Sequence, residues 1–398
     1  MNIKQAATRI GDKTHRVWTL LSLALRIAQS LGLLLDPTAY TINPFEREQR
    51  RRLFVAIGLL DAQAAVEKAS EPMIMGAWLV DTMIPLNIDD VDISPGMLSE
   101  PVARRGFTES TFLFLTTKTQ ILARFLCFSA SPDPRHNEWT ERQARLNAFQ
   151  QEIAPLFLTE DLQTRDSAWY WYAKTTAECI VAWMQLMAVR PLRQQIGVSA
   201  PVINHVDLLK LAVKVLEETH KIVRDSRGIP WRWYGGFFAP WHALAVSLAE
   251  LCVCHDVGLL NACWPIIQVS FFRMNDIAPE HSGDTVWEPM LRLMNKAEQK
   301  MSSLTIPDTV GETGEGYHSR FPPPGNEGPE QAALIDTSSL PAYQPPLEDL
   351  FDIWPDLGDP AFNVMTNVSS TSTDEIAWAS WEDFIHDYNQ TDGMIMFN

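Results

Sequence analysis

Apolar residues recur along the first three quarters of the chain at helical spacings. Near the N-terminus they are three or four positions apart, the pattern of a helix that turns one face to a core. These positions are Trp18, Leu21, Leu25, Ala28 and Leu31. Gly32 suits the left-handed residue that ends such a helix, and Asp36-Pro37 stops its continuation. The pattern therefore predicts a core-facing helix that ends near residue 31.

The residues Asn43-Pro44-Phe45-Glu46 predict the start of a second helix. Asn suits the cap, Pro the first turn, and Glu the third position after the cap. Glu46 with Arg50 and Glu48 with Arg52 are four residues apart, so both pairs are expected on the solvent side of this helix. Its basic run, Arg47 and Arg50 to Arg52, is either a nuclear-import patch or a solvated face, and the second reading is favoured.

Further helical patterns fill the chain to about residue 300, and strand-like alternation is nearly absent. The expected helices lie at about 107–129, 138–157, 167–189, 205–224, 240–256 and 286–302. The sequence thus predicts an all-α fold for a domain of residues 1–302, and it contains no convincing repeat.

Residues 303–398 differ sharply in composition and charge. The whole chain has a net charge of −17, but from Met301 onward there are 17 acidic residues against the single basic Arg320. The segment from Gly311 to Gly328 is rich in Gly, Pro and Glu, and such a composition cannot bury enough apolar surface to offset its ordering entropy. We therefore predict a largely disordered acidic tail.

Two segments of this tail, 347–362 and 374–388, combine acids with bulky apolar residues at helical spacing. This composition is typical of acidic activation segments that fold when they bind a coactivator groove. The alternative is that either segment packs on the protein's own core as a terminal helix. The candidate coactivator-binding residues are Leu350, Phe351, Trp354, Ile376, Trp381, Phe384, Ile385 and Tyr388.

The aspartates of the stretch PLNIDDVDISP, residues 85–95, do not fit a catalytic or metal-binding motif. An EF-hand loop that started at Asp90 would need Gly where Pro95 stands. The DDxxD motif of terpenoid cyclases would need Asp where Ile93 stands. A turn or helix cap is the simpler reading. Other catalytic motifs are absent from the sequence, so we expect neither an enzyme nor a metal site.

The five cysteines are few and lie in apolar surroundings, which favours free buried thiols over disulfides. Cys252-Val253-Cys254-His255 has no second ligand pair, so buried helix residues are favoured over a zinc site. His242 is expected to be a half-buried residue near a helix start. The sequence shows no signal peptide and no apolar run suited to a membrane span. These features together indicate a soluble intracellular protein.

Three consecutive blocks of the first hundred residues resemble the regulatory domain of fungal zinc binuclear cluster (Zn2Cys6) transcription factors. The blocks are TLLSLALRIAQSLGLLLDP, NPFEREQRRRLFVAIGLLDA and DTMIPLNIDDVDISP. They correspond to the family's LGL helix followed by DP, its arginine-rich helix ending in LD, and its LPLNIDDxDL segment. The resemblance is specific over residues 14–95, and over 160–300 it is one of character only: helical and rich in Trp.

The family's DNA-binding module does not appear in this sequence. That module needs six closely spaced cysteines to hold two zinc ions, and no cysteine precedes Cys127. No cofactor is therefore expected in this chain, and zinc only in the missing module. A truncated gene model and a natural regulator without the module remain alternatives.

The resemblance implies a transcriptional regulator in a fungal nucleus, with a coactivator bound through the tail. Homo- or heterodimers with related regulators are expected partners, DNA contact would be indirect or through the missing module, and no membrane is involved. Trp231, Trp233, Tyr234 and Trp241 are a speculative effector pocket, with core packing as the alternative. The competing functions are an unrelated small-molecule-binding or catalytic helical protein and a decoy that sequesters full-length relatives.

Overall fold

The computed structural model describes most of the first 305 residues. The described residues are 15–39, 41–67, 71–74, 79, 83–128, 139–159, 161–191, 205–231, 234, 240–277 and 287–305. All regular structure in these ranges is helical, which confirms the predicted all-α class. The α-helices are α2 (His15–Ser30), α3 (Pro44–Glu67), α4 (Thr111–Phe128), α5 (Trp139–Ile153), α6 (Leu162–Asp166), α7 (Ala168–Val189), α8 (His205–Arg224), α10 (Trp241–Val253), α11 (Val257–Ile277) and α12 (Trp287–Thr305).

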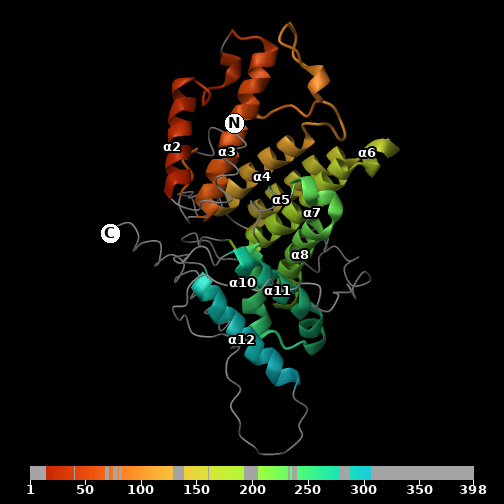
Figure 1. Cartoon of the computed structure of the whole chain (residues 1–398). Coiled ribbons are helices and arrows are strands. Elements are labelled where there is room, and N and C mark those ends of the chain that lie inside the picture. The colour runs from red at the N-terminus through yellow and green to blue at the C-terminus, as the bar shows by residue number, and fades with distance from the viewer. Residues whose placement is uncertain are drawn as a thin grey trace, which may run out of the picture.

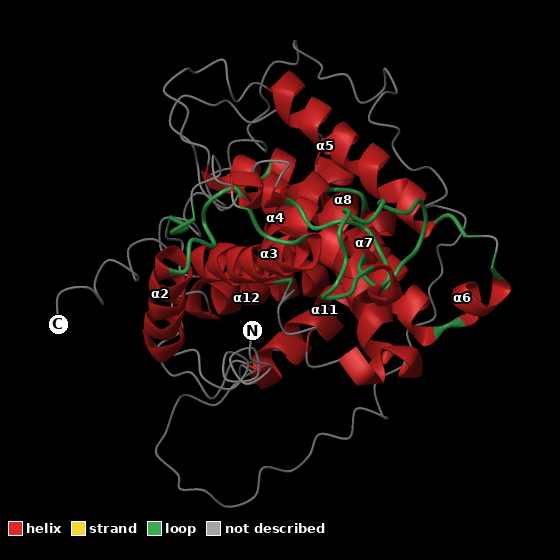
Figure 2. Ribbon diagram, turned by 90° about the horizontal axis from the view of Figure 1, so that it is seen from above, coloured by secondary structure: helices red, strands yellow, loops and turns green. Residues whose placement is uncertain are grey.

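Four short 3-10 helices join these elements: η1 (Pro37–Ala39), η4 (Asp90–Asp92), η6 (Ala154–Phe157) and η7 (Ser226–Trp231). Helix α2 and helix α6 lie at opposite edges of the helical body in both views (Figure 1, Figure 2). Helices α7 and α8 run through its middle, and α10 to α12 lie toward its lower end in Figure 1.

Helix α2 ends as its sequence predicts. Gly32 has a φ of 68°, and Leu33 donates its backbone N–H to the carbonyl of Ala28 at 2.9 Å, the bond that closes a Schellman-type C-cap. Leu21, Leu25 and Ala28 are buried against α3, as predicted. Leu31 is not: it is 59% exposed, and Leu33 is buried in its place. The chain turns at Gly32, so the helical periodicity no longer applies there.

Three apolar clusters form the core. The first joins α2, α3 and the segment around Ile74 and Met83. The second joins α4, α5 and α7, and the third joins α7, α8, α10, α11 and α12. Helix α7 contributes to two clusters because its buried residues cover nearly its whole circumference.

Helix α11 was not predicted from the sequence. Pro265 lies inside it, and proline normally ends a helical pattern. The helix packs on α8 and α10 through buried residues three or four positions apart, such as Leu260, Cys263 and Ile267. Among the described helices, α11 has one window, Val257–Met274, long and apolar enough to cross a membrane, and 33% of it is buried. Core helices of soluble proteins often have the same length and composition.

Two side chains, His242 and Cys252, differ from their predicted burial. His242, the second residue of α10, is 2% exposed and so fully rather than half-buried, like the residues of α10 that follow it. Burial lowers the pKa of this imidazole to about 3. The five cysteines are free, as predicted, and four of them are buried, whereas Cys252 is only half-buried. The Lys300 ammonium of α12 donates to the carbonyls of Cys252 and Cys254 at the C-terminal end of α10.

Candidate functional site

The arginine-rich face of α3 is a docking surface for a loop of the same chain. The pair Arg50–Glu46 (3.1 Å) is exposed, as predicted. The pair Arg52–Glu48 (3.1 Å) also forms, but Glu48 is 0% exposed. Arg51 is also buried, 3.7 Å from Glu48. The expectation that these residues lie on a solvated face is therefore wrong for Glu48 and Arg51, because residues 83–110 pack against them.

Glu48 receives the first part of this loop. The backbone N–H of Leu86 donates to both carboxylate oxygens of Glu48 at 3.3 Å. Burial raises the pKa of the Glu48 carboxyl, while the bonds from Arg52 and Leu86 favour its ionised form and oppose that rise. A buried carboxylate is stable only with such partners, so α3 and the loop depend on each other.

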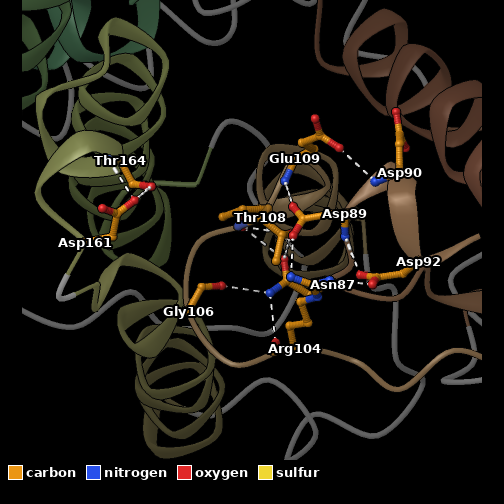
Figure 3. Close-up of polar contacts among 11 residues, drawn as sticks. Asn87, Asp89, Asp90, Asp92, Arg104, Gly106, Thr108, Glu109, Asp161 and Thr164 are labelled. Atoms are coloured by element: carbon orange, nitrogen blue, oxygen red, sulfur yellow. Dashed lines mark hydrogen bonds and ion pairs between the residues drawn. The ribbon is translucent and has the colours of Figure 1, made fainter.

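The three aspartates that follow hold the loop in shape (Figure 3). Asp89 Oδ2 lies 2.7 Å from Arg104 Nη1, and Asp92 pairs with the other nitrogen of the same guanidinium. Asp92 also accepts the backbone N–H of Asp89 at 3.0 Å, which closes a capping box around η4. Asp90 lies 2.9 Å from Arg52 Nη1 on α3. The predicted turn and cap role of this segment is what the geometry shows.

Arg104 and Glu109 hold the same loop from its other end. The bond to the Arg104 guanidinium lowers the pKa of the Asp92 carboxyl. Glu109 donates its backbone N–H to Asp89 at 2.9 Å, and its carboxylate accepts the backbone N–H of Asp90 at 2.7 Å. Each aspartate therefore pairs with an arginine of this chain, with Asp89 and Asp92 sharing the guanidinium of Arg104.

Asn87 is the buried centre of the same loop (Figure 3). Its Nδ2 donates to the carbonyls of Arg104 (3.0 Å) and Gly106 (2.9 Å). Its Oδ1 accepts the hydroxyls of Thr108 (2.8 Å) and Thr111 (3.0 Å). All four hydrogen-bonding positions of the amide are thus used. Asn87 therefore ties the aspartate segment to the start of α4.

Gly106 is required at its position for two reasons. Its φ is +88°, in the left-handed region that favours glycine. A Cβ atom there would also lie 2.9 Å from the carbonyl oxygen of Leu158. The loop can therefore pass close to the segment before α6. Asp161 is the N-cap of α6 and accepts the backbone N–H of Thr164 at 3.2 Å (Figure 3).

A second polar connection lies deeper, between α3 and α4. Asp61 is the last residue of the LD landmark, and its carboxylate accepts the backbone N–H groups of Met73 (2.9 Å) and Ile74 (2.8 Å). Arg124 donates to the same carboxylate at 3.1 Å and to the carbonyls of Ile74 and Gly58, each at 2.7 Å. Both side chains are buried. This pair fixes the segment after α3 to α4.

These polar groups have no arrangement suited to a metal. Across the described ranges, no group of three or more His, Cys, Asp or Glu side chains could hold a metal ion. The carboxylates instead accept from arginine and from backbone amides. We call this set of polar contacts the clamp, because it holds the segment after α3 and the loop of residues 83–110 on α3 and α4. Its members are Glu48, Arg52, Asp61, Asn87, Asp89, Asp90, Asp92, Arg104, Glu109 and Arg124.

Two of the four predicted effector-pocket residues, Trp231 and Tyr234, border the same aromatic cluster, in which the ring centroid of Phe112 lies 5.3 Å from that of Trp169 and 6.0 Å from that of Tyr172. The ring centroid of Trp231 lies 5.1 Å from those of Trp169 and Tyr172. The ring of Tyr234 lies 5.4 Å from Phe112 on α4. Trp241 instead packs on the third core cluster, and Trp233 lies outside the described residues. The described rings contact neighbouring aromatic or apolar side chains.

All eight candidate coactivator-binding residues, Leu350 to Tyr388, lie outside the described residues, as do both tail segments. The structure shows instead a set of residues that sequence reasoning did not select: Asn87, Arg104, Thr108, Glu109 and Arg124. A signal for them existed only in part. Asn87 stands inside the quoted LPLNIDD block, but its partners are 17 to 24 positions away and have no characteristic spacing.

One family model matches the part of the chain that contains this site. The family described as "Fungal specific transcription factor domain" matches residues 9–167, which include α2 to α4 and the whole clamp. No solved structure matches the chain.

Curated relatives extend the likeness beyond that domain. The chain is 32% identical over 311 residues to the C6 finger domain transcription factor nscR of Aspergillus fumigatus, which covers 75% of this chain and 39% of the relative. It is 33% identical over 323 residues to the C6 finger domain transcription factor adaR of Aspergillus niger, covering 75% and 40%. A match to nscR of Trichophyton rubrum is 28% identical over 412 residues, covering 95% and 57%.

The chain spans about two fifths of the length of the first two relatives, and its match to each covers three quarters of its own residues. The blocks that suggested the resemblance are the blocks that build the clamp around Glu48, Asp61 and the aspartate segment. Residues 9–167 of this chain carry the fungal specific transcription factor domain, and three quarters of the chain is similar to fungal C6 finger domain transcription factors.

Proposed function

We propose that this chain regulates transcription in a fungal nucleus as part of a zinc-cluster-type regulator. The observation that carries the proposal is the match of residues 9–167 to the fungal specific transcription factor domain, together with relatives named C6 finger domain transcription factors. These names favour a non-enzymatic role. In this proposal DNA is contacted through a zinc-cluster module or through a related partner, and dimers with such regulators supply the partner.

In this proposal the acidic tail recruits a coactivator. The supporting observation is in the sequence: 374–388 carries Trp381, Phe384 and Tyr388 among five acids and no Lys or Arg. Acids keep the aromatic anchors hydrated until a groove binds them, and folding on binding gives weak, exchangeable contacts. The helical domain has the separate role of presenting the tail and contacting partners.

A reporter assay tests this proposal. Residues 303–398 and the full chain are each fused to a heterologous DNA-binding domain. In a variant of each fusion, Phe351, Trp354, Trp381 and Phe384 are changed to Ala. We expect activation by the tail fusion, and a fall to the level of the DNA-binding domain alone when the four anchors are removed.

A matched control changes two apolar residues between the segments, Met365→Ala and Val368→Ala. This control should keep its activity, because it leaves both anchor sets intact. Equal loss in both variants, at equal protein abundance, would show that the activity does not reside in the two segments. No activation by the tail fusion would reject the tail as an activation domain.

A further inference from the structure

Helix α2 has a second apolar face that no described element covers fully. Leu20, Leu23, Ile27 and Leu31 are between 44% and 59% exposed. Leu20, Leu23 and Ile27 lie at positions i, i+3 and i+7, along one side of the helix, and Leu31 follows its last residue, Ser30. Leu21, Leu25 and Ala28 are buried on the side that meets α3. A surface helix normally has one apolar stripe, so the exposed stripe calls for a partner.

The position of α2 leaves this stripe accessible. The helix forms an outer edge of the molecule in both views and packs on α3 through its opposite side (Figure 1, Figure 2). Leu35, three residues after Gly32, is a further apolar side chain that is 56% exposed. A contiguous exposed apolar patch of this kind typically marks an interaction site.

The charge of α2 favours an acidic partner. The helix contains Arg16 and Arg26 and no Asp or Glu. Arg26 is exposed and stands near the middle of the stripe from Leu20 to Leu31. If two copies paired along this stripe about a two-fold axis, their Arg26 side chains would meet, and like charges repel. A 16-residue helix is also only about 24 Å long, so one face of it buries far less than the roughly 800 Å² per partner of a stable interface.

The chain itself contains a segment with the complementary pattern. Residues 374–388 place Ile376, Trp381, Phe384, Ile385 and Tyr388 at helical spacing, flanked by Asp374, Glu375, Glu382, Asp383 and Asp387. The segment has 15 residues, close to the 16 of α2. The 68 residues between Thr305 and Asp374 allow a separation of up to about 230 Å when fully extended. The segment can therefore reach α2 from the end of α12.

We propose that the exposed face of α2 binds the tail segment 374–388 of the same chain as an amphipathic helix. The aromatic anchors of the segment cover Leu20, Leu23, Ile27 and Leu31, and its acids lie near Arg26. Attachment to the same chain gives an effective concentration on the order of 1 mM, so a contact with a Kd of only about 0.1 mM is occupied about nine tenths of the time. Because the same anchors serve the proposed activation segment, coactivator and α2 compete for them.

Thiol reactivity in the full chain tests this contact directly. Leu23→Cys puts a small apolar thiol in the middle of the stripe, and its rate of alkylation is read by mass spectrometry of the peptide that contains residue 23. We expect the rate to rise about tenfold when Trp381 and Phe384 are changed to Ala, because the covering segment is released. The matched control is Leu98→Cys, at a loop residue that is 97% exposed, and its rate should not change with the tail variant.

Two outcomes would overturn the proposal. Equal rates at residue 23 with and without Trp381 and Phe384 would show that the segment does not cover α2. Protection that disappears on dilution would show that another copy of the chain covers it instead.

A second variant, Arg26→Glu, should raise the alkylation rate at residue 23 several-fold while the circular dichroism spectrum stays unchanged. The thiol readout does not depend on transcription, so it separates this proposal from a failure of the tail to activate a reporter.

Discussion

Different kinds of interaction stabilise the N-terminal and the C-terminal part of the helical body. The N-terminal part, from α2 to α4, relies on buried ion pairs and hydrogen bonds between residues far apart in sequence, such as Arg124 with Asp61 and Asn87 with Thr108. The C-terminal part, from α7 to α12, relies on one continuous apolar cluster. Polar networks need particular atoms at particular positions, whereas an apolar core needs volume and patterning.

This difference explains where the family could be recognised. The quoted blocks that carry the resemblance contain Glu48, Asp61, Asn87 and Asp89, residues that the polar network uses directly. The segment 160–300 resembled the family in character only, because many combinations of Leu, Val, Ala and Met fill an apolar core equally well. The family match to residues 9–167 covers the polar part and ends before α7.

The largest effect is expected from breaking the buried ion pair. Arg124→Met leaves the Asp61 carboxylate buried without its cation, and we expect a loss of about 3–5 kcal/mol in the free energy of unfolding, measured by urea denaturation. Adding Asp61→Asn should restore part of this loss, because the unpaired buried charge is then absent. Similar stability of the single and double variants would mean that the charge of Asp61 is not what makes the loss large.

The stability of the C-terminal part, α7 to α12, should depend on side-chain volume instead. Leu248 of α10 is fully buried in the third cluster, and we expect Leu248→Ala to lose about 3 kcal/mol but Leu248→Met less than about 1.5 kcal/mol. Arg124→Lys is the matching conservative change in the polar part. It should lose more than Leu248→Met, because one ammonium replaces the guanidinium that contacts Gly58, Asp61 and Ile74. Equal losses in the same urea titrations would contradict the contrast between the two parts.

Asn87→Ala should destabilise the loop by about 2–3 kcal/mol, because it removes two bonds to backbone carbonyls and two to the buried hydroxyls of Thr108 and Thr111. Hydrogen exchange should show the loss first in residues 83–110 and at the start of α4. Thr108→Val is a milder control that removes only one of the four bonds. An exchange pattern that changes equally in α10 would show that the loop does not respond as a separate polar unit.

Acid should weaken the apolar part through His242. Burial lowers the pKa of this residue to about 3, below the 6.5 of an exposed histidine, so the unfolded chain binds a proton that the folded chain excludes. Protonation of the unfolded chain therefore costs no stability above about pH 6.5. As the pH falls from there toward 3, the free energy of unfolding decreases, by about 2 kcal/mol at pH 5.

The neighbouring charged groups Arg190 and Glu250 lie in the same buried region. Because Phe cannot be protonated, His242→Phe should reduce the fall in the free energy of unfolding between pH 7 and pH 5 in denaturation measurements. The carboxylates of the chain titrate below that range. A slope equal to that of the original protein would show that His242 is not the group responsible.

The smallest effect is expected at the exposed end of the clamp. Asp90 is 69% exposed and pairs with Arg52, so Asp90→Asn should change the free energy of unfolding by less than about 1 kcal/mol. The pair should weaken further at high salt. A loss as large as that of Asn87→Ala would mean that the outer ion pairs, and not the buried amide, hold the loop.

Local rules predicted the features that depend on neighbouring residues. Asn43 caps α3 by accepting the backbone N–H of Glu46 at 2.7 Å, and Gly32 ends α2 as expected. Features decided by distant partners were not predictable in this way. Glu48 was placed in solvent because its i,i+4 spacing with Arg52 is also the pattern of a surface pair, and only the approach of Leu86 buries it. Helix α11 was missed because Pro265 normally interrupts a helix, and its packing on α8 and α10 overrides that preference.

The sharing of α4 and α7 between clusters has a consequence for how the molecule unfolds. Leu113 of α4 packs on the first cluster while Leu115 and Leu122 belong to the second, and α7 supplies residues to the second and the third. No described boundary therefore separates the helical body into parts with independent cores. Cooperative unfolding should run through both helices, so a protease cut between the two ends would leave neither fragment with its own complete interior.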